Sequence, residues 1–392
     1  MPRPDPLAYL AGEVQSLRDQ GLFRSPRVLD GEQAARASVD GRSVVNLSSN
    51  NYLGLTTHPR LRARAEEALR RYGVGSGSVR TIAGTMDIHL ELERRLAAFK
   101  QTDAAVVFQS GFAANAGTVA AILTKDDVVV SDELNHASII DGCRLSRAEI
   151  RVFPHRDLDG ARAALRDLPR RQRTLLVSDG GFSMDGDLGA LPGLCDLADE
   201  FGCIMMVDDA HASGVSGRDG RGTIDLFGLH GRVDVQVGTL SKAIGALGGY
   251  VAGSRTLIEF LSQRARPFLF STSHPPAVAA TCLAALDVLE NEAGNGASAQ
   301  QCGAHGGSGG GRILPQGSFG TPPCRSIIAQ REQGLRISIL EDDPDQLALL
   351  KRWLADDGHD VHGYQSGRDA MKYAGRESFD LFVLDWQVPD VS

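Results

Sequence analysis

The sequence predicts an α/β protein built around a mostly parallel β-sheet with helices on both faces. Short apolar strands alternate with helical segments between residues 104 and 252, an alternation typical of parallel sheets. Polar residues follow the ends of these strands, where such sheets bind their ligands. The predicted strands are 104–108, 128–131, 150–153, 174–179, 203–208, 233–238 and 249–252, and the helical segments include 113–123 and 190–202.

The elements before residue 104 are predicted from shorter signals. Asp5 followed by proline indicates a helix start, with an apolar stripe that runs to Leu17. A short strand is expected at 42–47, and the polar Asn50 beyond it is either a ligand contact or part of a capped turn. A glycine-rich segment at 73–85 precedes a helix expected from about Met86, whose apolar residues fall on one face.

Composition excludes several classes of protein. The chain has 392 residues, 42% of them hydrophobic, and a net charge of −8, so it lacks the basic surface that nucleic-acid binding needs. No apolar run reaches the ~20 residues of a membrane span. Six scattered cysteines without a CxxC pair fit reduced thiols. We expect a cytoplasmic protein without a nucleic-acid or membrane partner.

The segment 233–252 carries the first candidate for chemistry. It reads as an apolar strand, a polar turn containing Thr239, then Lys242 and a glycine-rich run. A desolvated lysine loses its proton readily and attacks carbonyl groups, and the neighbouring hydroxyls suit an anion. The alternative is an exposed loop lysine.

Further candidates follow other strand ends. Asp208 ends a buried strand, where an acid needs a positive partner such as a pyridinium nitrogen; the alternative is an acid that caps the next loop. His211 lies within reach of a phenolate or carboxylate, and His136 is placed to stack on an aromatic ring unless it is structural. The helix start at 110–112 offers free amides to an anion, and Ser183 adds a hydroxyl.

These features together match the needs of pyridoxal 5′-phosphate (PLP). Residues 1–292 resemble the alpha-oxoamine synthase family, fold-type-I PLP-dependent transferases that include glycine C-acetyltransferase (2-amino-3-ketobutyrate CoA ligase) and 8-amino-7-oxononanoate synthase. The resemblance lies in the segments NNYLGL, GSGSVRTIAGT, SDELNHASIIDG, FSMDGDLGALP, VDDAHASGVSG, GTLSKAIGALGGYVAGS and FSTSHPP, which occur in this order.

The resemblance implies a role for each candidate. Lys242 forms the Schiff base with PLP, Asp208 pairs with the pyridine nitrogen, and His136 stacks on the ring. The phenolic oxygen is expected near Ser183 and His211. The phosphate is expected to be held by Ser110, Gly111, Phe112 and Thr239, and by Ser271 and Thr272 acting on the partner subunit's site in a homodimer. Asn50 is expected to help hold the substrate.

The implied reaction condenses a small amino acid, glycine or alanine, with an acyl-CoA. Lys242 removes the α-proton, the α-carbon attacks the thioester, and an amino ketone or a 2-amino-3-oxo acid forms as CoA leaves. One alternative is an aminotransferase of the same fold, which the segments NHASIIDG and FSTSHPP disfavour. The other is a signalling protein in which a second domain regulates or replaces catalysis.

The sequence changes character after Glu292. Residues 293–334 are glycine-rich and are expected to be a disordered linker. Nothing beyond Glu292 matches the small C-terminal domain of the family, which carries a carboxylate-binding arginine, so we expect this chain to be an impaired catalyst.

Residues 335–392 resemble the first half of a response-regulator receiver domain, a partial flavodoxin-like fold. Glu341 and Asp342 correspond to its Mg²⁺-binding acids, and Asp385 corresponds to its phosphoacceptor. With half of that fold absent, we expect neither a metal site nor phosphoryl transfer here.

Overall fold

The computed structural model divides into two compact units, Met1–Asn46 and Leu47–Ser392. No described helix is long and apolar enough to cross a membrane. The structure describes residues 3, 5–46, 48–168, 173–291, 336–340, 344–356, 360–366, 368–369, 372 and 381–384.

The described residues of the first unit form one helix and a small antiparallel sheet. Helix α1 (Leu10–Asp19) begins later than predicted. The reason is that the Asp5 carboxylate accepts the amide of Leu7, only two residues on, and closes a turn before the helix. The three strands pair in the order β1-β2-β3 and are β1 (Leu29–Asp30), β2 (Arg36–Val39) and β3 (Arg42–Val45), the last at the predicted position.

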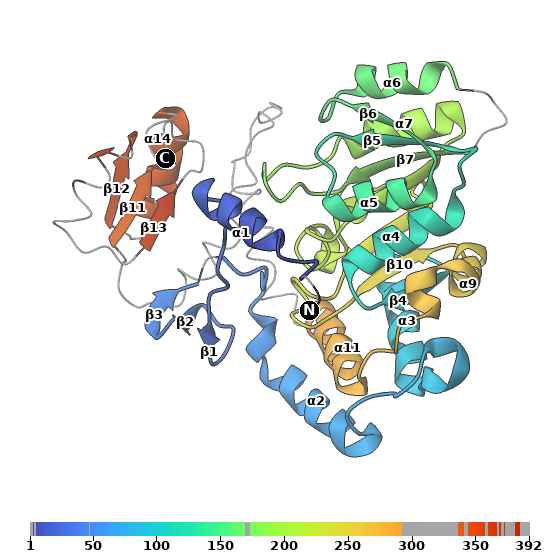
Figure 1. The fold of residues 1–392 in the computed structure, drawn as a ribbon, viewed down its shortest axis with the longest axis horizontal. Helices are drawn as coiled ribbons and strands as arrows, with labels where there is room; N and C mark the ends of the chain where they lie inside the picture. The colour runs from blue at the N-terminus through green and yellow to red at the C-terminus, as the bar shows by residue number, and fades with distance from the viewer. Residues whose placement is uncertain are drawn as a thin grey trace, which may run out of the picture. The chain divides into compact units, whose positions relative to one another are not determined.

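The centre of the second unit is a seven-stranded sheet in the order β4-β10-β9-β8-β7-β5-β6 (Figure 1). All neighbours pair in parallel except β10, which runs antiparallel to both β4 and β9. The prediction of a mostly parallel sheet is therefore confirmed. The strands are β4 (Ala104–Phe108), β5 (Val128–Asp132), β6 (Glu149–Phe153), β7 (Thr174–Asp179), β8 (Ile204–Asp208), β9 (Val235–Thr239) and β10 (Gly249–Gly253).

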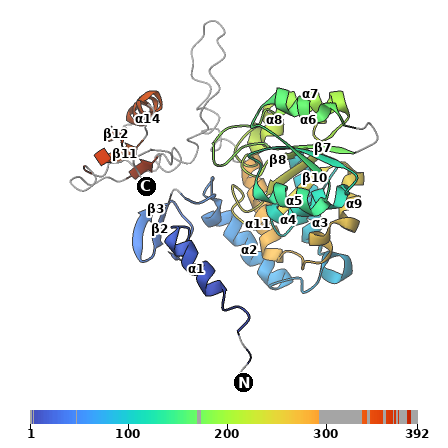
Figure 2. The ribbon, with the colours of Figure 1, turned by 45° about the horizontal axis from the view of Figure 1, so that its top comes forward.

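Helices bury both faces of this sheet because its strands are apolar on both sides. Val129 packs into one cluster of buried side chains, whereas its neighbours Val128 and Val130 pack into another on the opposite face. Figure 2 shows α6 and α7 on one side and α4 and α5 on the other. These helices are α4 (Gly111–Ile122), α5 (Ala137–Ser146), α6 (Leu158–Arg166) and α7 (Leu191–Phe201).

A further group of helices packs beside β4 and β10. Helix α3 (Asp87–Lys100) starts one residue after the predicted position and buries the predicted stripe, including Leu92 and Leu96. It shares a cluster of buried side chains with α2 (Pro59–Tyr72) and α11 (Pro276–Asn291). These two helices are not among the predicted elements.

The last described segments form a three-stranded parallel sheet with one helix. The sheet order is β12-β11-β13, and Leu347 and Leu354 of the helix pack on Ile337 and Ile339. The elements are β11 (Arg336–Leu340), α14 (Pro344–Asp356), β12 (Asp360–Tyr364) and β13 (Leu381–Leu384). The expected linker at 293–334 and the acids Glu341, Asp342 and Asp385 lie outside the described residues.

Candidate active site

A cavity of about 430 Å³ opens at the carboxyl ends of the central strands, where the sequence places its polar residues. Nine of the eleven residues predicted to bind the cofactor line it: Ser110, Gly111, Phe112, His136, Ser183, Asp208, His211, Thr239 and Lys242. The other two, Ser271 and Thr272, do not line this cavity, and neither does Asn50. Nine residues that were predicted from separate segments of the sequence therefore line one cavity.

Asp208 is the last residue of β8 and is 3% exposed. Its Oδ2 accepts a hydrogen bond of 2.5 Å from Asn115 Nδ2, and its Oδ1 accepts one of 2.9 Å from the Ala210 amide. Burial raises the pKa of the Asp208 carboxyl, and these hydrogen bonds and the nearby Lys242 offset that rise only in part. An acid in this position favours a cationic partner in the cavity.

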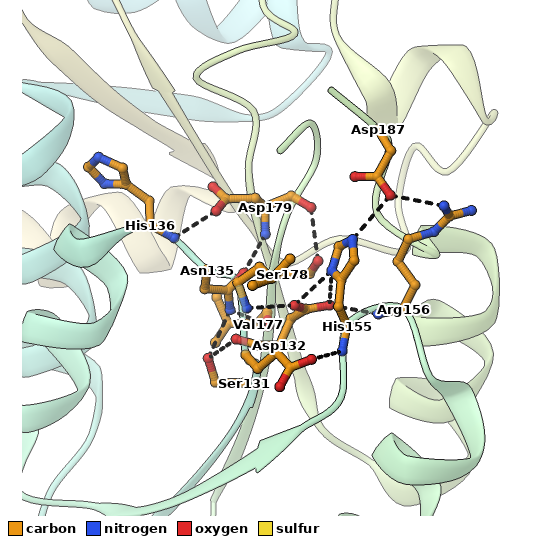
Figure 3. A network of polar contacts seen from close by, with 12 residues as sticks. Ser131, Asp132, Asn135, His136, His155, Arg156, Val177, Ser178, Asp179 and Asp187 are labelled. Atoms are coloured by element: carbon orange, nitrogen blue, oxygen red, sulfur yellow. Dashed lines mark hydrogen bonds and ion pairs between the residues drawn. The ribbon is translucent and has the colours of Figure 1, made fainter. Parts of the chain in front are cut away.

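A second buried acid, Asp179, ends the neighbouring strand β7 in register with Asp208. Its burial and the adjacent Asp208 carboxylate raise the pKa of Asp179 well above its ordinary value. Its Oδ2 accepts the His136 amide at 2.8 Å, as Figure 3 shows. Asp179 was not predicted, although the acid at the end of strand 174–179 is a signal of the same kind as Asp208.

Lys242 lies in the loop between β9 and β10 and is half-buried. Burial lowers the pKa of its ammonium group, and the carboxylates of Asp208 and Asp179 oppose that effect without cancelling it. The neutral amine, which is the nucleophile, is thus available at lower pH than in an ordinary lysine.

His211 is tied to the 48–55 segment through Tyr52, another residue that was not predicted. The Tyr52 hydroxyl lies 2.7 Å from His211 Nδ1 and 3.3 Å from Asn50 Oδ1. Burial, with the nearby Lys242 and His136, lowers the pKa of His211 to about 4. Its ring is therefore neutral at pH 7, and Tyr52 connects Asn50 to His211, a residue of the cavity wall, through two successive hydrogen bonds.

His136 precedes helix α5 and caps it by accepting the Ser138 amide at Nδ1. A continuous polar chain runs from this ring to the buried acid. His136 Nδ1 lies 2.7 Å from Ser138 Oγ, which accepts from Asn115 Nδ2, which also donates to Asp208. The exposed His136 ring is therefore anchored at its base, while the remainder of the ring faces the cavity.

Hydroxyls and free amides gather at the other end of the cavity. Ser110 caps α4 by accepting the Ala113 amide at 3.0 Å, and the first amides of any helix lack intrahelical partners. Across from it, Thr239 Oγ1 lies 2.7 Å from Ser241 Oγ. A Cβ on Gly249 would stand 2.4 Å from the Ser110 carbonyl, so only glycine lets β10 start this close. This end suits a phosphate.

Thr272, which follows Ser271, lies against the glycine-rich segment 73–85. Thr272 bridges to Val79, and its carbonyl accepts a 2.7 Å hydrogen bond from Gln109 Nε2. Their absence from the lining of the cavity agrees with the expectation that they act on a partner subunit's site, which stays a prediction.

The donor set of the cavity fits PLP, an aldehyde with a pyridine nitrogen and a phosphate. The half-buried Lys242 suits the aldehyde, the buried pair Asp208 and Asp179 suits a protonated ring nitrogen, and the start of α4 suits the phosphate. One buried acceptor, Asn115 Oδ1, also has no hydrogen-bond partner among the described residues.

Comparison with known proteins agrees with this chemistry. Residues 42–301 match the aminotransferase class I and II family, and residues 337–392 match the response regulator receiver domain. The 8-amino-7-oxononanoate synthase of Symbiobacterium thermophilum is 55% identical over 285 residues, which is 72% of this chain and 73% of that protein. 8-Amino-7-oxononanoate synthase 1 of Bacillus subtilis is 54% identical over 284 residues, 72% of each protein.

Solved structures of related enzymes are also similar to this chain. A serine palmitoyltransferase variant from S. paucimobilis with a bound PLP–myriocin aldimine matches with a TM-score of 0.69 at 34% identity, over 74% of each chain. The 8-amino-7-oxononanoate synthase of Francisella tularensis matches with a TM-score of 0.56 at 30% identity, over 66% of this chain and 72% of that one.

The chain therefore belongs to the aminotransferase class I and II family and has the fold of its PLP-dependent enzymes. Within that family it is an alpha-oxoamine synthase type of protein, similar to the 8-amino-7-oxononanoate synthases, and it also carries a receiver-domain segment. The resemblance inferred from the sequence is confirmed for both parts.

Proposed function

We propose that this chain condenses a small amino acid with an acyl-CoA, releasing CoA and an amino ketone or a 2-amino-3-oxo acid. The observation that supports this most is the placement of Lys242 beside two buried acids in one cavity with a phosphate-type subsite. Bound PLP supplies the electron sink for the negative charge that develops at the substrate's α-carbon.

The residues of the chain then have separate tasks. Lys242 Nζ anchors the cofactor and afterwards takes the α-proton, since its lowered pKa makes the neutral amine accessible. Asp208 keeps the pyridine nitrogen protonated, and Asp179 holds the His136 loop beside it. His136 covers the ring, and the phenolic oxygen is held by Ser183 and the neutral His211.

The remaining predicted residues would bind the cofactor's phosphate and the substrate. Asn50 is hydrogen-bonded to Tyr52, which in turn contacts His211 of the cavity wall, and Asn50 would contact the amino acid. We propose a homodimer because Ser271 and Thr272 do not line their own chain's cavity. The residues proposed to hold the phosphate are Ser110, Gly111, Phe112 and Thr239 within the chain, with Ser271 and Thr272 from the partner subunit.

The product named for the relatives supports alanine as the amino acid that we propose. In 8-amino-7-oxononanoate the amino carbon bears a methyl group and adjoins the ketone. Alanine gives this unit when its α-carbon bonds to the thioester carbonyl, the C–S bond breaks, and the carboxylate leaves as CO₂. The nine carbons then require a seven-carbon acyl group that ends in a second carboxylate.

The test is CoA release, followed with a thiol reagent, from L-alanine and the seven-carbon ω-carboxyacyl-CoA. Lys242→Ala is the control for cofactor-dependent turnover. We expect CoA release that depends on both substrates. The rate with glycine in place of alanine measures the specificity for the amino acid. A cofactor-loaded chain that forms a 2-oxo acid without acyl-CoA would instead favour the aminotransferase alternative.

The match to a receiver domain supports one alternative function, a signalling protein regulated by phosphorylation at Asp385, which lies outside the described residues. CoA release measured with and without acetyl phosphate tests this alternative. A rate that changes with acetyl phosphate would indicate regulation, and an unchanged rate would indicate catalysis without it.

A further inference from the structure

The turn 182–187 carries Ser183 and Met184 to the wall of the cavity. Two backbone hydrogen bonds close it: the Phe182 amide donates to the Asp187 carbonyl, and the Gly186 amide donates to the Phe182 carbonyl, both at 2.9 Å. Ser183 and Met184 are exposed, and Met184 is 88% exposed. What fixes the turn relative to the sheet must therefore lie at its base.

The base of the turn is fixed by His155, in the loop after β6. As Figure 3 shows, its ring stands between two acids: Nδ1 is 3.0 Å from Asp132 Oδ1, and Nε2 is 3.1 Å from Asp187 Oδ2. The ring also meets Phe182 edge-on, with centroids 4.4 Å apart. A neutral imidazole has one N–H, so only an imidazolium can donate to both carboxylates.

Asp132 is a firm anchor for this arrangement. It ends β5, is 2% exposed, and also accepts the amides of Leu134 and Arg156. Asp187, by contrast, belongs to the turn, and its Oδ2 is held by His155 and by Arg156 Nη1 at 2.9 Å. Its Oδ1 is buried without a hydrogen-bond partner among the described residues.

We propose that His155 is a positioning residue for the reaction: its imidazolium links Asp132 to Asp187 and so sets where Ser183 stands in the cavity. This inference rests on the proposed function, in which Ser183 contacts the cofactor's phenolic oxygen. His155 itself is not among the residues that line the cavity, and it acts through the turn.

The charges around His155 make the link sensitive to pH. The ring faces Asp132 and Asp187, Glu133 accepts its backbone amide, and Arg156 follows it in the chain. Burial disfavours the charged ring and by itself lowers the pKa of His155. The hydrogen bonds to the two acids and their negative charges outweigh that effect, so the pKa of His155 is raised. The link is complete below that raised pKa and is lost as pH rises through it.

The test uses His155→Asn, which keeps a donor near Asp132 but does not reach Asp187, and Asp187→Asn as a second variant that leaves the His155–Asp132 pair. The control is His230→Asn, since His230 pairs with Asp225 at 3.1 Å and does not line the cavity. The first readout is hydrogen exchange of the 182–187 amides in the full chain without cofactor. Losing a charge-assisted hydrogen bond should speed it about tenfold.

The second readout is the pH dependence of the bound cofactor's absorbance in His155→Asn, Ser183→Ala and the double variant. We expect His155→Asn to shift the midpoint in the same direction as Ser183→Ala, and the double variant to match Ser183→Ala alone. The proposal would be overturned if hydrogen exchange of the 182–187 amides were unchanged in both His155→Asn and Asp187→Asn. It would also be overturned if the double variant shifted the midpoint by the sum of the shifts of His155→Asn and Ser183→Ala. CoA release by the unaltered chain is recorded separately, because its absence would count against the proposed function and not against these two readouts.

Discussion

Lys100 and Asp209 form a fully buried ion pair directly behind the candidate active site. The Lys100 side chain is 1% exposed and that of Asp209 is 0% exposed, with Nζ 2.8 Å from Oδ2. Nζ also donates to the Arg221 carbonyl at 2.5 Å, and Asp209 accepts from the Thr223 amide and hydroxyl. The pair thus fixes the chain that follows Asp208.

We expect Lys100→Met to destabilise the chain by about 3–5 kcal/mol, because it leaves a buried carboxylate without its cation. That is a large share of the ~5–15 kcal/mol that stabilises a typical domain. Lys100→Met combined with Asp209→Asn should recover much of the loss, since asparagine keeps an acceptor for Thr223. The exposed pair Arg144–Asp141 is the comparison, and Arg144→Met should cost at most ~1 kcal/mol.

The assay is urea unfolding of the chain without cofactor, because a bound ligand adds its own stability. Both tryptophans, Trp353 and Trp386, lie beyond residue 334. Far-ultraviolet circular dichroism is therefore the signal to follow for the large sheet. A loss below ~1 kcal/mol in Lys100→Met, or a double variant as unstable as the single one, would refute the reasoning.

Three further outcomes are expected. Lys242→Ala should abolish both Schiff-base absorbance and CoA release, where a general base alone contributes ~10²–10⁴-fold; unchanged absorbance would contradict its role. Asp208→Asn should keep PLP bound yet slow α-proton exchange on alanine, measured by deuterium loss, and near-normal exchange would exclude the role of this acid. Asp385 should take up no stable phosphoryl group from acetyl phosphate, so labelling that disappears in Asp385→Ala would show the receiver segment to be active.

The sequence was sufficient to predict the strands of the large sheet because each is a short apolar run between polar segments. Local patterns also singled out Asp208 and Lys242, which the structure brings to one cavity, and their roles stay predictions. Helix α2 escaped prediction because it is rich in arginine and buries only Leu61 and Ala68. A periodic stripe that narrow gives little signal.

The residues that were missed depend on pairings between distant parts of the chain. Asp179 matters because register places it beside Asp208, and Asn115 because α4 carries it over the end of β8. Tyr52 meets His211 from 159 residues away. A local sequence pattern shows neither strand register nor helix placement, so these contacts could be found only in the structure.

The antiparallel direction of β10 has a consequence for the order of assembly. Thr239 and Gly249, which flank the Lys242 loop, are register partners only ten residues apart. Asp208 pairs with Val237 across 29 residues. Closing the longer loop costs about 1 kcal/mol more in chain entropy, so the lysine-bearing hairpin has the lower contact order. The Lys242 loop is therefore closed by a more local contact than the one that joins Asp208 to β9.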